Sequence, residues 1–383
     1  MNEELSIYVD HICRMLNNYN KIMVFGAGKV GYEIYRILKK YNIFGGYIDN
    51  DETKRKYGFM GENVYSLESV ANEKIFFVIA GSEKNSLEME RQLKMQGVIN
   101  NKNYAMADEF RKRILPIIIF YQFGDLYTNL AQICVTERCT LKCKKCAHAC
   151  HMVDINSNDM AIEKAIESAD NFFSCFDYVG EFVLIGGEPF LYKKLDELIE
   201  YIGMHYRDRI GLFSITTNGT IIPNSQLINV CIKHDVTIRI SNYSKTLPNL
   251  EKQYCRLYEV LRDVQCITWE TDNQKSWFDY GFDHKIQKTI EETKKTFESC
   301  RTMCREVNGD KYYYCVMAHT VAQNMKLKEG LNDYIIIKKN TNRNTILEFE
   351  LGYLEKGYLD MCGRCRGKDA ENYLIPAAEQ VAK

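Results

Sequence analysis

Three cysteines stand close together in this chain, at Cys139, Cys143 and Cys146. They follow directly on an apolar run, Ala131 to Val135, that is typical of a buried β-strand. Thiolates spaced within eight residues can wrap one compact iron–sulfur cluster, and three ligands for four irons leave one iron without a protein ligand. The segment is therefore expected to fold as a loop at a strand end, with one coordination position open to a second molecule.

Strand and helix patterns alternate from about residue 126 onward. Helical patterns cover 161–173 and 195–202, and strand-like runs cover 182–185, 212–216 and 236–240. A polar motif follows each of these runs: Gly-Gly-Glu-Pro, then Thr-Asn-Gly, then a serine. Repeated βα units predict a full or partial barrel, whose active sites are built at the carboxyl ends of the strands. The motif residues are Gly186, Gly187, Glu188, Pro189, Thr217, Asn218, Gly219 and Ser241.

Together these motifs resemble the radical S-adenosylmethionine (SAM) superfamily, over about residues 126 to 370. The resemblance implies that Cys139, Cys143 and Cys146 ligate a [4Fe-4S] cluster whose open iron binds SAM. It implies reductive cleavage of SAM to a 5′-deoxyadenosyl radical, with a flavodoxin- or ferredoxin-type reductant. One departure is Lys145, which stands where the family often has an aromatic residue against the adenine. The SAM contacts that the resemblance implies are Gly186, Gly187, Glu188, Pro189, Thr217, Asn218 and Ser241.

A structural zinc site is the alternative for the cysteine triplet. Zinc would need a fourth ligand, which Cys150, His148 or His151 can supply. A zinc ribbon, however, does not require a Gly-Gly-Glu-Pro turn 40 residues further along the chain. The combination of motifs therefore favours the iron–sulfur cluster.

A second group of five cysteines lies later in the chain, around the stretch 308–315, which resembles the hairpin of SPASM and twitch auxiliary-cluster domains. The resemblance implies one auxiliary [4Fe-4S] cluster with four thiolate ligands. Either Cys300 or Cys304 can be the first ligand. Fourteen residues separate Cys300 from Cys315, whereas only 10 separate Cys304 from Cys315, and we favour Cys300. A structural zinc ion also suits such a group. The cysteines are Cys300, Cys304 (the alternative to Cys300), Cys315, Cys362 and Cys365.

The first hundred residues show the order of a parallel sheet. Strand-like runs cover 21–25 and 75–80, and a helical pattern covers 29–40. A G-x-G-x-x-G motif joins the first strand to the helix, and an acid follows 18 residues after the last glycine. Such a motif places a pyrophosphate at a helix N-terminus and the acid on ribose hydroxyls, although a turn kept only for folding has the same glycines. The candidate nucleotide contacts are Gly26, Gly28, Gly31 and Asp49.

A chain of 383 residues suits two or three domains. We expect an α/β protein with an N-terminal Rossmann-like domain (1–107), a partial (β/α)6 barrel (108–290) and a small C-terminal auxiliary-cluster domain (291–383). The formal charge of −1, with both signs interspersed, argues against nucleic-acid or membrane-surface binding. The longest apolar run, Ile114 to Tyr121, is too short to span a bilayer, and the start of the chain lacks a secretory pattern. We therefore expect a cytoplasmic location.

The N-terminal segment resembles the small Rossmann-type domains attached to enzymes of nucleotide-sugar and surface-polysaccharide metabolism. We accordingly expect an oxidoreductase acting on a carbohydrate, cyclitol or nucleotide sugar by dehydrogenation or epimerisation, with the auxiliary cluster handling the substrate electron. Maturation of a ribosomal peptide is the second possibility, and a non-enzymatic iron–sulfur or zinc protein that senses redox state or binds a partner is the third. The sequence selects no catalytic acid, base or hydrogen donor. Candidate residues at the barrel mouth are Arg239, Tyr243, Lys245, Trp269, Glu270, Trp277 and Asp279.

Overall fold

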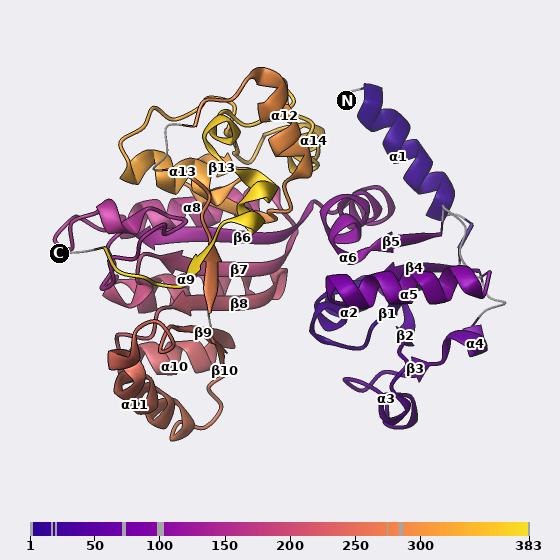
Figure 1. The fold of residues 1–383 in the computed structure, drawn as a ribbon, viewed down its shortest axis with the longest axis horizontal. Coiled ribbons are helices and arrows are strands. Elements are labelled where there is room, and N and C mark those ends of the chain that lie inside the picture. The colour runs from indigo at the N-terminus through magenta and orange to yellow at the C-terminus, as the bar shows by residue number, and fades with distance from the viewer. Residues whose placement is uncertain are drawn as a thin grey trace. The chain divides into compact units, whose positions relative to one another are not determined.

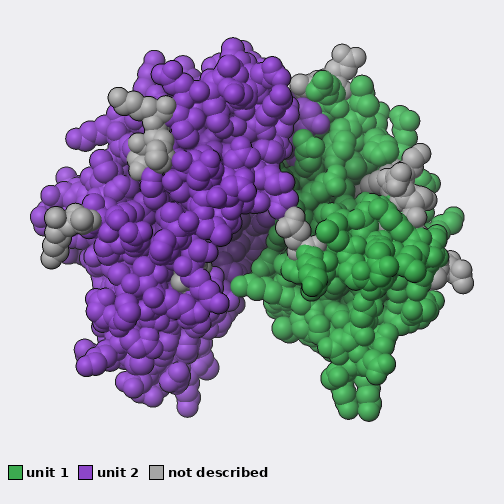
Figure 2. All heavy atoms as spheres, viewed as in Figure 1, with its two compact units in different colours: residues 1–127 green, residues 128–383 purple. Residues whose placement is uncertain are grey.

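A computed structural model describes residues 3–16, 18–19, 21–70, 74–97, 103–273, 275–282 and 286–381. The chain divides into two compact units, residues 1–127 and 128–383 (Figure 2). Both units combine helices with strands that pair in parallel, so the expected α/β class is confirmed. The domain boundaries expected at 107 and 290 stay predictions.

The first unit contains a parallel five-stranded sheet in the order β3-β2-β1-β4-β5 (Figure 1). The expected strand at 21–25 and helix at 29–40 are confirmed. Strand β4 is buried along its whole length, which accounts for its unbroken apolar sequence. The strands are β1 (Lys21–Phe25), β2 (Phe44–Ile48), β3 (Val64–Tyr65), β4 (Ile75–Ile79) and β5 (Tyr104–Met106). The longer helices are α1 (Glu3–Leu16), α2 (Lys29–Lys40) and α5 (Glu83–Met95), and the shorter ones are α3 (Glu52–Tyr57), α4 (Leu67–Val70) and α6 (Ala107–Glu109).

The apolar run Ile114 to Tyr121 is helical, with α7 (Leu115–Ile118) continued on both sides by π-helical turns. Ile117, Ile118 and Ile119 are buried within the first unit. None of the helices in the described ranges is long and apolar enough to cross a membrane.

The second unit is built on an eight-stranded sheet in the order β10-β9-β8-β7-β6-β12-β13-β14 (Figure 1). Strands β7 to β10 pair in parallel, as do β6 and β12, whereas β13 and β14 are antiparallel additions. The strands are β6 (Tyr127–Thr136), β7 (Tyr178–Gly186), β8 (Ile210–Thr217), β9 (Val236–Asn242), β10 (Trp269–Asn273), β12 (Cys304–Asn308), β13 (Lys311–Tyr313) and β14 (Tyr334–Ile336).

Helices alternate with these strands as the sequence periodicity indicates. The expected helices at 161–173 and 195–202 correspond to α8 (Ile162–Cys175) and α9 (Leu195–Tyr206). The remaining helices are α10 (Ser225–Lys233), α11 (Glu251–Arg262), α12 (Ile290–Ser299), α13 (Val316–Asn324) and α14 (Arg343–Glu350). A separate two-stranded sheet pairs β11 (Ser276–Phe278) with β15 (Leu374–Pro376), which brings two distant parts of the chain together.

A buried ion pair joins the β12–β13 hairpin to α14. Arg305 Nε lies 3.1 Å from Glu350 Oε2, and the two side chains are 1% and 5% exposed. Glu350 also accepts hydrogen bonds from Thr128 Oγ1 at 2.9 Å and Tyr312 Oη at 2.7 Å. The hairpin leads directly to Cys315, so this network fixes part of the second cysteine group.

Glu350→Ala is expected to lower the free energy of unfolding by about 3–5 kcal/mol, because Arg305 would be left as a buried charge without its partner. Glu291→Ala is the matched control, since it breaks an exposed pair with Lys295 and should change stability by less than about 1 kcal/mol. Urea unfolding of the anaerobic protein measures both values. Equal values for the two variants would contradict the assignment of Arg305 and Glu350 as a structural pair.

Candidate active site

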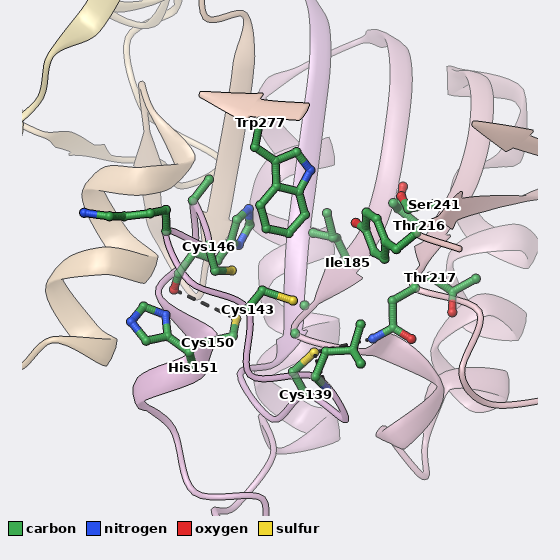
Figure 3. A pocket seen from close by; sticks show the side chains of 18 of the residues that line it. Cys139, Cys143, Cys146, Cys150, His151, Ile185, Thr216, Thr217, Ser241 and Trp277 are labelled. Carbon is green, nitrogen blue, oxygen red and sulfur yellow. Dashed lines mark hydrogen bonds between the residues drawn. The ribbon is translucent and has the colours of Figure 1, made fainter. Parts of the chain in front are cut away.

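A cavity of about 390 Å³ lies at the carboxyl ends of β6 to β9, and the cysteine triplet lines it (Figure 3). Cys139, Cys143 and Cys146 come from the loop after β6. Five of the residues expected to contact SAM line the same cavity from the ends of β7, β8 and β9. These are Gly186, Gly187, Thr217, Asn218 and Ser241.

Gly186, the last residue of β7, and Gly187 allow this turn to pack directly on the cysteine loop. A Cβ atom at Gly186 would lie 2.2 Å from the carbonyl oxygen of Thr136, and one at Gly187 would lie 2.3 Å from that of Arg138. Any side chain at either position would therefore displace backbone. The close approach also allows Gly187 N to donate a hydrogen bond to Thr136 O at 2.8 Å.

Glu188 lies behind the cavity wall, and its side chain is completely buried. Its Oε1 accepts hydrogen bonds from Phe190 N at 3.0 Å and Thr217 Oγ1 at 2.8 Å, and its Oε2 accepts one from Asn218 N at 2.8 Å. Burial raises the pKa of Glu188 to about 7. Glu188 and Pro189 do not line the cavity, and the SAM contacts expected of them stay predictions. In the structure Glu188 holds the Thr-Asn-Gly turn in position.

The sulfur atoms of the triplet receive hydrogen bonds from separate parts of the second unit. Cys139 Sγ accepts one from Asn218 Nδ2 at 3.5 Å, and Cys143 Sγ accepts one from Gln380 Nε2 at 3.2 Å. Burial raises the pKa of Cys139 to about 11 and that of Cys143 to about 12. A hydrogen bond with Cys150 lowers the pKa of Cys146. Donors of this kind stabilise thiolates, which is the form that binds iron.

The donor set fits an iron–sulfur cluster, because each thiolate of a [4Fe-4S] cluster binds a different iron and the cysteines surround a cavity. In the part of the chain that the structure describes, no three His, Cys, Asp or Glu side chains converge on one point as a single metal ion would require. The possible fourth zinc ligands Cys150, His148 and His151 do line the same cavity. The buried Nδ1 atoms of both histidines have no hydrogen-bond partner.

Aromatic side chains face the cavity even though Lys145 precedes the third cysteine. Tyr243 and Trp277, both among the candidates for the barrel mouth, line it, and their ring centroids lie 5.4 Å apart in an edge-to-face arrangement. Lys145 forms an ion pair with Asp279 at 3.3 Å, and Arg366 pairs with the same carboxylate at 2.6 Å. Phe278 and Tyr280 also line this cavity, although no sequence motif pointed to either residue.

Tyr280 lines the cavity, and it packs against the same hydrophobic cluster as Cys304 and Cys315 of the second cysteine group. Burial is the main reason that the pKa of Tyr280 rises to about 12, and negative charge on four of the cysteines adds to the shift. Burial and then three other cysteines raise the pKa of Cys315. Burial is also the main reason that the pKa of Cys304 rises to about 11, with smaller effects of Arg305, Glu181 and Cys300. The cysteines that add to the pKa of Tyr280 are Cys300, Cys304, Cys315 and Cys365, and those that add to the pKa of Cys315 are Cys300, Cys362 and Cys365.

In the first unit, two of the three motif glycines are required by packing. Gly26 has φ of +117°, and a Cβ there would lie 2.2 Å from Ala80 O. A Cβ at Gly31 would lie 2.0 Å from the carbonyl oxygen of Gly26. At Gly28 a Cβ would meet no atom within 4 Å, so the packing of the unit does not require a glycine there.

Asp49 closes the glycine turn from the end of β2. Its Oδ2 accepts a hydrogen bond from Ala27 N at 2.8 Å and lies 3.2 Å from Lys54 Nζ. Its Oδ1 accepts a hydrogen bond from Asp51 N at 2.9 Å. The acid expected to bind ribose is therefore beside the motif, but its oxygens already contact donors of the chain.

Comparison with known proteins gives two family matches. Residues 133–236 match the Radical SAM superfamily, and residues 18–104 match the family described as C2185-like, N-terminal. No curated protein matches the chain. The first match contains the cysteine triplet and both turns that follow β7 and β8.

Among solved structures, native anSMEcpe with bound AdoMet is 12% identical, with a TM-score of 0.41 over 61% of this chain and 84% of that one. BtrN in complex with AdoMet and 2-DOIA is 13% identical, with a TM-score of 0.40 over 67% and 98%. Streptococcus suis SuiB bound to precursor peptide SuiA is 16% identical, with a TM-score of 0.31 over 54% and 48%. The match spans about half the length of SuiB.

Proposed function

We propose that this chain, an iron–sulfur and SAM-dependent enzyme of the radical SAM superfamily, is an oxidoreductase that removes hydrogen from a carbohydrate, cyclitol or nucleotide sugar. The observation that carries the proposal is the single cavity in which the cysteine triplet meets the ends of β7, β8 and β9. When bound there, the cluster and SAM supply a 5′-deoxyadenosyl radical that abstracts hydrogen from an unactivated C–H bond. The outcome is dehydrogenation or epimerisation of the substrate.

The residues of the chain hold and enclose the reacting groups. The three cysteines bind the cluster, and the turn at Gly186 and Gly187 presents backbone to the methionine moiety of SAM. Asn218 is fixed by Glu188 through its backbone N–H, and it contacts both Cys139 and the cavity. Tyr243 and Trp277 supply apolar surface that excludes water from the site.

The second cysteine group is assigned to one auxiliary [4Fe-4S] cluster. Four thiolate ligands leave no open iron, so such a cluster accepts or relays an electron and does not cleave SAM. Tyr280 supports this role, because its side chain lines the cavity and packs against the same hydrophobic cluster as Cys304 and Cys315. The ligands are Cys300, Cys315, Cys362 and Cys365, with Cys304 as the alternative to Cys300.

Deuterium transfer tests the substrate class. Anaerobically reconstituted protein is reduced with SAM present and supplied with carbon-deuterated sugars, cyclitols and nucleotide sugars. Deuterium in the 5′-deoxyadenosine product from one of these compounds is the expected result, because hydrogen moves directly from substrate to the adenosyl carbon. Transfer only from a carbon-deuterated peptide mixture would contradict the carbohydrate assignment and would support peptide maturation.

The first unit is assigned a nucleotide-binding role, with Rossmann-like topology in residues 1–107. The open space at Gly28 supports this role. Packing within the unit does not require a glycine there, and the space beside it can hold a ligand at the N-terminus of α2. The order of strands β3-β2-β1-β4-β5 also agrees with such a domain.

Gly28→Val is expected to weaken binding of a nucleotide sugar at least about tenfold, because its side chain would occupy the approach to the pyrophosphate. Isothermal titration of the full chain with UDP-glucose and with NAD measures the effect. The thermal midpoint should stay close to that of the wild type, since a side chain at position 28 meets no protein atom at its Cβ. Absence of binding by the wild-type chain, or equal binding by the variant, would contradict the nucleotide site.

A further inference from the structure

Residues 374–381 form a strap that runs along the cysteine loop. Its first part is β15, which pairs antiparallel with β11, and all three residues of β11 line the cavity. Its second part runs beside the loop: Lys144 N donates to Glu379 O at 2.6 Å, and Val381 N donates to Lys142 O at 2.8 Å. Ala377 and Ala378, between these two parts, are completely buried. The strap is therefore packed as part of the site.

Gln380 brings a hydrogen-bond donor from the strap to the middle cysteine of the triplet. Its Nε2 donates to Cys143 Sγ at 3.2 Å and to Ala378 O at 2.7 Å. Its Oε1 accepts a hydrogen bond from Lys142 N at 2.7 Å. This network fixes the orientation of the amide, because a flipped side chain would place Nε2 against an N–H and Oε1 against a carbonyl oxygen.

We propose that Gln380 is a positioning residue that raises the reduction potential of the cluster held by Cys139, Cys143 and Cys146. The proposal rests on the proposed function, since it requires that cluster. An N–H directed at a ligand sulfur draws electron density from the thiolate and favours the reduced cluster, which carries one more negative charge. Cys143 is only 6% exposed, so water screens this interaction little.

Gln380→Met tests the proposal, because methionine has similar length and shape but no N–H. At a given solution potential, the ratio of reduced to oxidised cluster should fall about three- to tenfold. A tenfold fall corresponds to a reduction potential lower by about 59 mV for a one-electron couple. Gln380→Glu keeps an acceptor for Lys142 N and places a negative charge near the sulfur, so its potential should fall at least as far. Dithionite supplies the electron in a potentiometric titration followed by EPR, using the signal that changes when SAM is added.

Glu379→Gln is the matched control on the strap. This substitution weakens the ion pair between Glu379 Oε1 and Lys144 Nζ, which are 2.7 Å apart. Both side chains are 43% exposed, and the pair does not involve a cysteine sulfur. The reduction potential of the triplet cluster in this variant should equal that of the wild type. Iron and sulfide analysis verifies that each variant holds its clusters. A wild-type potential in Gln380→Met, or an equal shift in Glu379→Gln, would overturn the role of Gln380 while leaving the proposed function intact. If the wild-type protein has no EPR signal that responds to SAM, the proposed function and this inference both fail.

Discussion

Replacement of Cys139, Cys143 and Cys146 by alanine is expected to reduce the iron content from about eight to about four atoms per chain and to abolish 5′-deoxyadenosine formation. The reason is that, in the proposed function, the triplet leaves an iron open for SAM, whereas four thiolates saturate the auxiliary cluster. Iron and sulfide analysis after anaerobic reconstitution, with chromatography of the nucleoside products, measures both effects.

A control for this triple variant is Cys255→Ala/Cys266→Ala, which removes two exposed thiols outside both cysteine groups. It should keep about eight irons and full SAM cleavage. Two zinc ions per chain in the wild type, without brown colour, would contradict the iron–sulfur assignment. SAM cleavage that persists in the triple variant would also contradict it.

Replacement of Cys362 and Cys365 by alanine is expected to separate SAM cleavage from substrate oxidation. The variant should retain about four irons and still form 5′-deoxyadenosine, while formation of oxidised substrate should fall at least about a hundredfold, because the substrate electron has lost its acceptor. Mass spectrometry of the same reaction mixture measures the amount of oxidised substrate formed per 5′-deoxyadenosine. Unchanged oxidation with only four irons bound would contradict the electron-accepting role.

Single alanine variants at Cys300 and Cys304 then identify the remaining ligand. The spacing to Cys315 favours Cys300 as this ligand, so Cys300→Ala should lose the auxiliary cluster. Cys304→Ala should retain it, because only 10 residues separate Cys304 from Cys315. The opposite result would make Cys304 the ligand.

Much of the candidate site was predictable because its parts are local in sequence. Each motif follows an apolar run that forms a strand, and parallel strands bring their carboxyl ends to the same edge of a sheet. Cys139, Gly186, Thr217 and Ser241 therefore meet in one cavity although they are spread over four strands. The glycine turn at Gly26 was predictable for the same local reason.

Other features depend on contacts that no local pattern records. Gln380 lies 237 residues from Cys143 in the sequence, and the two meet because β15 pairs with β11. The orientation of Glu188 is set by backbone donors at Phe190 and Asn218, and the second of these lies 30 residues away in the sequence. Trp277 reaches the cavity through the same β11–β15 pairing, in which it lies opposite Ile375, a residue far along the sequence.

Reductive cleavage of SAM by the reconstituted wild-type protein is the most direct test of the cavity as a radical SAM site. Reduced protein with about eight irons per chain should convert SAM into 5′-deoxyadenosine and methionine in equal amounts, because one bond of the sulfonium is broken. A protein that holds both clusters and is fully reduced, yet forms no 5′-deoxyadenosine, would contradict the proposed chemistry.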